Sequence, residues 1–73
     1  MRLIVQAELE GTLRGWDGAT VFALANGETW RQSAFRARTL HVCDPMVRIW
    51  AAGMHYWLEI EGACEILPVT RVT

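Results

Sequence analysis

Apolar and polar residues alternate along most of this chain, and no stretch of ten residues repeats its apolar positions with the spacing of a helix. The alternation is clearest in residues 2–10, where one set of alternate positions is apolar: Leu3, Val5, Ala7 and Leu9. Successive side chains of a β-strand point to opposite faces, so this pattern predicts a half-buried strand. Ile4 breaks the alternation. Residues 11–14 are expected to continue or bend the same strand.

A hairpin is predicted around Asn26-Gly27, with strands at residues 19–24 and 28–34. Asn and Gly tolerate the positive φ angles that short hairpin turns need, so the pair is a strong turn signal. The loop can hold two residues or three, and each length fixes a different register.

The two registers place different side chains on the buried face. A two-residue turn sets Phe22 opposite Arg31, whereas a three-residue loop with Gly27 at positive φ sets Phe22 opposite Trp30. The second register gathers Phe22, Leu24 and Trp30 on one face. Because a slip of one residue exchanges the faces, burial of these side chains favours the three-residue loop.

Two later stretches are less regular. Residues 35–44 are predicted to form an irregular extended segment that stops before Pro45, since proline restricts the residue before it. Near the end of the chain, residues 64–67 are predicted to form a short strand. Pro68 is expected to break it, and residues 69–72 to supply a closing piece.

A second hairpin is predicted from residues 46–51 and 54–61, with its turn at Ala52-Gly53. In this register the inner pairs are Val47 with Leu58 and Ile49 with Tyr56. The outer pairs are Met46 with Glu59, Arg48 with Trp57, and Trp50 with His55. Cross-strand pairs that combine aromatic rings and an arginine contribute about 0.5–1 kcal/mol each.

These elements make one domain that spans residues 1–73. Short strands separated by glycine turns are typical of a small sandwich or barrel. The fold class predicted is all-β, a small SH3-like barrel of five to six short antiparallel strands. An OB-fold usually needs a longer chain and a helix, and the sequence offers no place for that helix.

Composition adds an expectation of self-association. Apolar residues make up 52% of the chain and include four tryptophans, which is more than one small core needs. Some apolar surface is therefore expected to remain exposed, and a homodimer is the simplest assembly that covers it. No apolar stretch approaches the 18 residues of a membrane span, and residues 1–11 do not resemble a signal peptide. A cytoplasmic location follows as an expectation.

The predicted interface is a cluster on the outer face of the second hairpin. Its members are Arg48, Trp50, His55 and Trp57, since a soluble monomer seldom leaves two tryptophans on an open sheet face. Residues 35–43 or a chain terminus could instead fold over this face. Trp16, beside a predicted turn, has two interpretations: packing over the barrel end with its N–H bonded to the backbone, or an anchor for a partner.

No catalytic, metal or cofactor site is predicted. His41, Cys43, His55 and Cys64 are the candidate metal ligands, but their spacing matches no known zinc module. A disulfide between Cys43 and Cys64 is not expected in the cytoplasm. Cys43 and His41 also lack a third residue to orient a catalytic base, and the chain is too short for a deep pocket. The protein is therefore not expected to be an enzyme.

The chain resembles a small family of uncharacterised bacterial proteins with an SH3-like barrel. The resemblance lies in GWDGATVFALANGETWRQ at residues 15–32, in DPMVRIWAAGMHYWLEIEG at residues 44–62 and in PVTRV at residues 68–72. Family members usually carry alternating tyrosines after the Trp-x-Gln motif. This chain has other residues there: Ser33, Phe35, Ala37, Thr39 and His41. The resemblance implies the fold and brings no catalytic residues with it.

Two functions follow as hypotheses. The first is a self-associating protein-interaction or scaffold domain. The alternative is a nucleic-acid-binding small β-barrel, in which tryptophans stack on bases and Arg36, Arg38 and Arg48 contact phosphates. A net charge of −1 weighs against the alternative, because nucleic-acid binders of this size usually carry a positive excess.

Overall fold

The computed structural model describes residues 1–63 and 65–72, and these residues form eight strands in two antiparallel sheets. The all-β prediction is confirmed, although the strands outnumber the five to six expected. Their bounds are β1 (Arg2–Glu8), β2 (Thr12–Trp16), β3 (Val21–Ala23), β4 (Thr29–Gln32), β5 (Arg38–Cys43), β6 (Met46–Ala52), β7 (His55–Ile60) and β8 (Ile66–Arg71).

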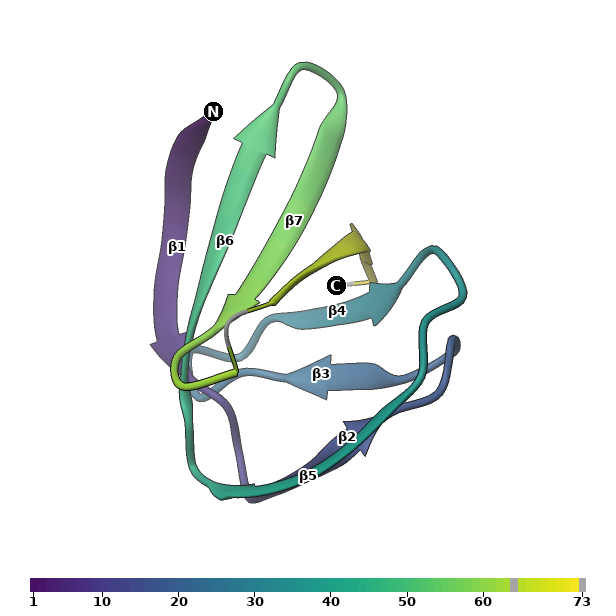
Figure 1. Cartoon of the computed structure of the whole chain (residues 1–73). Coiled ribbons are helices and arrows are strands. Elements are labelled where there is room, and N and C mark those ends of the chain that lie inside the picture. The colour runs from purple at the N-terminus through teal and green to yellow at the C-terminus, as the bar shows by residue number, and fades with distance from the viewer. Residues whose placement is uncertain (64, 73) are drawn as a thin grey trace.

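Six of the strands form one sheet in the order β1-β6-β7-β8-β4-β3. Figure 1 shows β1, β6 and β7 nearly upright while β4 and β3 lie across the view, so the sheet bends strongly on its way through β8. Its two edges meet only at one end, where Leu9 and Leu24 form an isolated bridge. Two backbone bonds flank the bridge, from Glu10 N–H to Ala23 and from Ala25 N–H to Glu8. The sheet therefore curls around a core without closing into a barrel.

From Val5 onward β1 follows the predicted alternation, but the prediction for Leu3 is wrong. Leu3 was expected on the same face as Val5 and lies on the opposite face, because the strand is irregular where the sequence breaks the pattern. Leu3 pairs with Trp50 and Val5 with Ile49, so the register with β6 shifts at Ile4. An extra residue of this kind is a β-bulge, which bends the strand and leaves one residue unpaired. Ile4 accordingly is exposed, and the residues after it keep their predicted faces.

The register of the β3–β4 hairpin is confirmed. Phe22 pairs with Trp30, and the N–H of Leu24 donates to the carbonyl of Glu28 at 2.9 Å. Gly27 has a φ of 93°, as the three-residue loop requires. Phe22, Leu24 and Trp30 are all nearly inaccessible to solvent. Burial thus selects between the two registers as the one-residue slip argument predicts.

The predicted register of the β6–β7 hairpin is wrong by two residues. Trp50 pairs with Trp57 rather than His55, and Arg48 pairs with Glu59 rather than Trp57. The turn lies at Gly53-Met54, with Gly53 at a φ of 61°. Glycine at the first central position of a two-residue loop is typical of a type II′ turn. A shift of two residues keeps every side chain on its face, so burial alone could not distinguish the registers.

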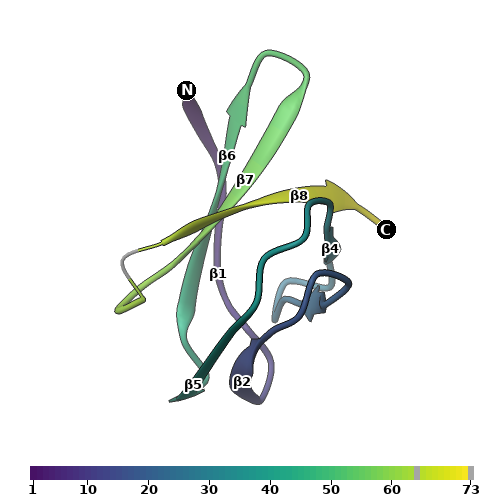
Figure 2. The ribbon, with the colours of Figure 1, turned by 45° about the vertical axis from the view of Figure 1, so that its right-hand side comes forward.

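Residues 11–14 were expected to continue or bend β1, and residues 35–44 to be irregular. Instead, most of these residues belong to β2 and β5, which pair with each other as a two-stranded ribbon. Leu13 and Trp16 point from β2 into the core and are 5% and 4% exposed. Figure 2 shows this ribbon at the lower end of the molecule, beneath the bent sheet. Gly15 allows the close approach of the two strands, since a Cβ there would collide with the backbone of Arg38. Residues 35–43 therefore do not cover the outer face of β6 and β7 by pairing with it.

Pro68 lies inside β8 and does not break it, contrary to the prediction. It pairs with Trp57, and its carbonyl accepts the N–H of Ser33 at 2.9 Å. The N and the C=O of one strand residue face the same neighbour. The missing N–H of Pro68 therefore points toward the end of β4 and removes no bond to β7.

The core lies inside the bend of the larger sheet, with the ribbon covering its lower end. Its most completely buried side chains come from five strands of the large sheet and from the loop after β3 (Figure 1). They are Trp30, Phe22, Leu24, Ile49, Leu58, Ile60, Leu67 and Val47. None of the described residues belongs to a helix that could span a membrane.

Candidate functional site

The outer face of β1, β6, β7 and β8 carries two rows of side chains that cross all four strands. Strand pairing sets their order, because residues opposite each other share a face. The apolar row is Leu3, Trp50, Trp57 and Pro68. The row beside it is Gln6, Arg48, Glu59 and Ile66. We call these eight residues the outer-face patch.

The patch holds three of the four residues predicted to cluster on this hairpin. Trp50 and Trp57 lie directly opposite each other, and both are half-buried in the free chain. The indole N–H of Trp50 donates to the carboxylate of Glu59 at 3.0 Å, which fixes the orientation of its ring. His55 lies beyond the patch, next to the turn and opposite Ala52, and is exposed.

Charges of both signs border the apolar row. The Arg48 guanidinium lies 4.0 Å from the carboxylate of Glu59 and 3.6 Å from that of Glu61. Exposed ion pairs at such distances contribute little to stability. They do leave a cation beside two anions on one surface, an arrangement that can be complementary to itself across a two-fold axis.

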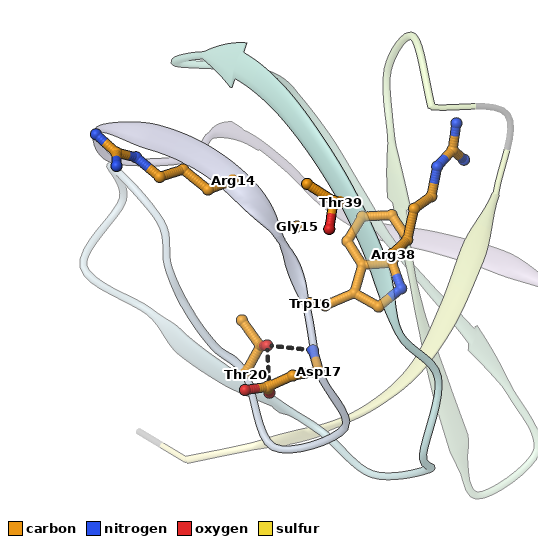
Figure 3. A pocket seen from close by; sticks show the side chains of 7 residues that line it. All are labelled: Arg14, Gly15, Trp16, Asp17, Thr20, Arg38 and Thr39. Atoms are coloured by element: carbon orange, nitrogen blue, oxygen red, sulfur yellow. Dashed lines mark hydrogen bonds between the residues drawn. The ribbon is translucent and has the colours of Figure 1, made fainter.

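Trp16 lies elsewhere, in the lining of a hollow beside β2 and β5, and Figure 3 shows the side chains that line it. The hollow has a volume of about 280 Å³, and its lining includes Gly15, Asp17, Arg38 and Thr39. Trp16 is only 4% exposed, and its indole N–H has no partner among the described residues. The ring is therefore packed as one interpretation predicted, but without the expected backbone bond.

Arg38 fastens the ribbon to the turn between β7 and β8. Its guanidinium donates to the carbonyl of Ala63 at 2.7 Å and to the carboxylate of Glu65 at 2.9 Å. Arg36 donates to the carbonyl of Ile66 at 3.0 Å. The three arginines proposed as phosphate ligands, Arg36, Arg38 and Arg48, thus all have partners within the chain.

A buried amide that sequence reasoning did not single out ties two loops together. Gln32 is 3% exposed, and its carbonyl oxygen accepts the N–H of Gly18 at 2.9 Å. Its amide nitrogen donates to the carbonyls of Ala34 and Arg36 at 3.0 and 2.9 Å. The alternation of the strand could have predicted that Gln32 is buried, because Gln32 lies two residues after Trp30 and shares the inner face of β4 with it.

Asp17 closes the turn after β2 with its own side chain. Its carboxylate accepts the N–H of Ala19 at 3.2 Å and the hydroxyl of Thr20 at 3.1 Å, as Figure 3 shows for the second of these bonds. The bond from Ala19, followed by that from Thr20, lowers the pKa of Asp17 below its usual value. The turn is an Asx-type turn whose geometry favours the ionised carboxylate.

The candidate metal ligands that the structure describes are His41, Cys43 and His55, and they do not form a metal site. No three His, Cys, Asp or Glu side chains among residues 1–63 and 65–72 lie close enough together to hold an ion. Cys43 has a free thiol, and its hypothetical partner Cys64 lies outside the described residues.

The outer-face patch and the Trp16 hollow are thus the two surfaces with distinctive side chains. The patch combines paired tryptophans with charges of both signs, whereas the hollow is open and bordered mainly by polar groups. Comparison with family models, with curated proteins and with solved structures found no match to this chain.

Proposed function

We propose that this protein is a self-associating interaction domain whose outer-face patch packs against the same patch of a second copy. The observation that supports this most directly is the Trp50–Trp57 pair, which lies on the outward face of the sheet in line with the exposed Leu3. Tryptophan and arginine are enriched among residues that contribute most to binding, and here both types lie side by side.

The area that such a contact needs indicates which residues it includes. A stable interface of ordinary size removes about 800 Å² from each partner. The chain exposes 4443 Å² in total, so the contact would cover close to a fifth of it. In this proposal the contact covers most of the outer face of β1, β6, β7 and β8. Leu3 and Ile66, which are 41% and 37% exposed, would lie at its rim.

We also propose that the fold is a variant of the SH3-like barrel to which the sequence is similar. In support, the six-stranded sheet bends around one core and its edges touch at Leu9 and Leu24. The length of the chain suits the same architecture. In this proposal the domain acts in the cytoplasm as a scaffold and has no catalytic role.

Light scattering at rising protein concentration tests the interface. The wild type is expected to gain mass with concentration, and Trp57→Glu to lose the outer-face contact and about half of that mass. Replacing a central interface tryptophan typically costs 2 kcal/mol or more, a change of about thirtyfold in the dissociation constant.

Val21→Glu is the matched control, because Val21 is 54% exposed on the short edge strand β3 and lies outside the patch. It is expected to assemble as the wild type does. Thermal unfolding of both variants checks that they are folded. A wild type that stays a monomer at millimolar concentration would contradict the proposal, as would a folded Trp57→Glu variant with unchanged mass.

A further inference from the structure

We infer that Asn26 is a site of spontaneous chemical modification, and that one of its products loosens the junction at which the two edges of the large sheet meet. The observation is an exposed Asn-Gly pair in a loop that shapes the fold. Asn26 and Gly27 belong to the three-residue loop between β3 and β4, and both are exposed. Figure 1 shows this loop beside the end of β1, next to the Leu9–Leu24 bridge.

The reaction uses two groups that the chain already holds next to each other. The backbone nitrogen of Gly27 attacks Cγ of Asn26 and loses its proton, so that an N–Cγ bond forms, the Cγ–Nδ2 bond breaks and ammonia leaves. The product is a five-membered cyclic imide. Water then opens the imide at either carbonyl and gives an aspartate or an isoaspartate, each with one more negative charge than the asparagine. Glycine favours the attack because it has no Cβ beside its nitrogen.

Asn26 is the position of this chain where the reaction is expected. It is the single asparagine in the sequence. The other side-chain amides belong to Gln6 and Gln32, and their longer side chains would have to close a less favourable six-membered ring.

The Asp17-Gly18 pair could form the same imide, but the fold protects it. The N–H of Gly18 donates to the buried Gln32 at 2.9 Å. The N–H of Ala19, bonded to the carboxylate of Asp17, lowers the pKa of that carboxyl and keeps it ionised. A carboxylate resists attack, because the attack would place a second negative charge on it. The neutral amide of Asn26 has no such protection.

The folded loop slows the reaction without preventing it. The N–H of Gly27 donates to the carbonyl of Leu24 at 3.0 Å, and this bond must break before the nitrogen can attack. The side-chain oxygen of Asn26 accepts the N–H of Glu28 at 2.9 Å, which restrains rotation of the amide. Because the reacting residues are exposed, the opening is local and does not require the core to unfold.

Isoaspartate at this position changes the main chain as well as the charge. The backbone then passes through Cβ and Cγ, so the loop gains one carbon atom. The loop is fixed in length by the bonds from Leu24 N–H to Glu28 and from Gly27 N–H to Leu24. Ala25, at the start of the same loop, donates its N–H to the carbonyl of Glu8 in β1 at 2.8 Å. Lengthening the loop therefore loosens the junction with β1.

Peptide mapping by mass spectrometry tests the reaction. The protein is incubated at neutral pH, folded in buffer and unfolded in urea. Deamidation at Asn26 is expected in both states, and at least about fivefold more slowly in the folded protein. Asn26→Gln is the control and is expected to give no product in the same time. A folded protein that forms no product over many half-times of the unfolded chain would overturn the inference, as would equal rates in the two states.

The two products give a matched comparison, because they have the same mass and charge and differ only in the path of the backbone. Chromatography separates them, and an isoaspartate-specific methyltransferase identifies the isoaspartate form. The N–H groups of Ala25 and Glu10 donate across the junction, to Glu8 and Ala23. These two amides are expected to exchange with solvent at least about tenfold faster in the isoaspartate form than in the aspartate form. Asn26→Asp is expected to behave as the aspartate form does.

The outcomes of this comparison are decisive. Equal exchange at the two amides in both products would overturn the effect on the junction. Exchange that is accelerated equally in both products and in Asn26→Asp would trace the change to the added charge, and would overturn it as well. The inference does not depend on the proposed self-association, because the loop lies outside the outer-face patch and neither test measures assembly.

Discussion

The six-stranded sheet and the β2–β5 ribbon are attached to the same core by different forces. The sheet contributes most of the fully buried apolar side chains, such as Leu58 and Ile49. The ribbon contributes Leu13, Trp16 and the partly buried Leu40, and it also depends on specific polar contacts around it: Gln32 with the neighbouring loops, and Arg38 with Ala63 and Glu65.

The difference teaches that one small domain can contain two levels of stability. The hydrophobic effect does not depend on the direction in which two side chains meet, so apolar burial stabilises the sheet as a unit. The ribbon depends on individual bonds and on the close approach at Gly15, so it is the part expected to open locally. The N–H of Trp16, which has no partner among residues 1–63 and 65–72, adds to this, because a buried donor without a partner costs about 1–3 kcal/mol.

The largest effect is expected from Leu58→Ala, which tests the sheet. Leu58 is completely buried, and removing such a side chain costs about 2–5 kcal/mol through lost burial and a cavity. Chemical unfolding followed by circular dichroism measures the loss. Val21→Ala, at a 54% exposed position, is the control and is expected to change the free energy of unfolding by less than about 0.5 kcal/mol. Equal losses in the two variants would contradict a core centred on β7.

Gly15→Ala tests the ribbon and is expected to cost about 3 kcal/mol. Gly15 has a φ of 121°, and the new Cβ would lie 3.0 Å from Thr39 Cα and closer still to the Arg38 carbonyl. Gly11→Ala is the matched control, since Gly11 has a φ of 80° with open space around it, and it is expected to cost about 1–2 kcal/mol.

Hydrogen exchange of the Gly15→Ala variant sharpens the comparison. If the two regions differ as described, amides in β2 and β5 exchange faster while those of β6 and β7 change less. A uniform acceleration through both sheets would show that the domain opens only as a whole.

Gln32→Ala is expected to cost about 2 kcal/mol, because it leaves the N–H of Gly18 and two carbonyls without their partners in a part-buried site. Gln6→Ala removes the same group from an exposed position and is the control. Both are measured by chemical unfolding at low protein concentration, where self-association does not contribute. A loss below about 0.5 kcal/mol for Gln32→Ala would mean that water replaces these bonds without cost.

The smallest effect is the pH dependence from Asp17. Its folded-state pKa is lowered, so the stabilising contribution is present above the unfolded pKa of about 3.9 and is lost as the pH falls through the lower folded value. Asp17→Asn should therefore make the unfolding midpoint less sensitive to pH below about 4. A titration of the Asp17 carboxyl by NMR checks the direction, and a pKa at or above the usual value would contradict it.

Prediction from sequence succeeded where burial and register are linked. A one-residue slip in the β3–β4 hairpin would have exposed Phe22 and Trp30, so alternation was sufficient to choose. A two-residue slip in the β6–β7 hairpin exposes nothing new. In that hairpin the prediction of which face holds Arg48, Trp50 and Trp57 is correct, but the predicted cross-strand partners of these residues are wrong.

The ribbon was missed because its determinants are not local. β2 meets a strand that begins more than twenty residues later, its register is interrupted between Leu13 and Gly15, and its edges are polar. The same reason applies to the hollow at Trp16, which exists only once Arg38 and Thr39 lie beside Gly15. Alternation describes one strand at a time and contains no information on such pairings.

The pairing of β1 with β6 has a consequence for how the chain matures. Arg2 pairs with Ala51, so β1 stays without its partner strand until β6 has been translated. Contacts this distant along the chain slow folding into the millisecond-to-second range that is typical of all-β domains. During that interval β1 is an apolar nascent segment without a partner, and the speed of translation determines how long chaperones have to protect it.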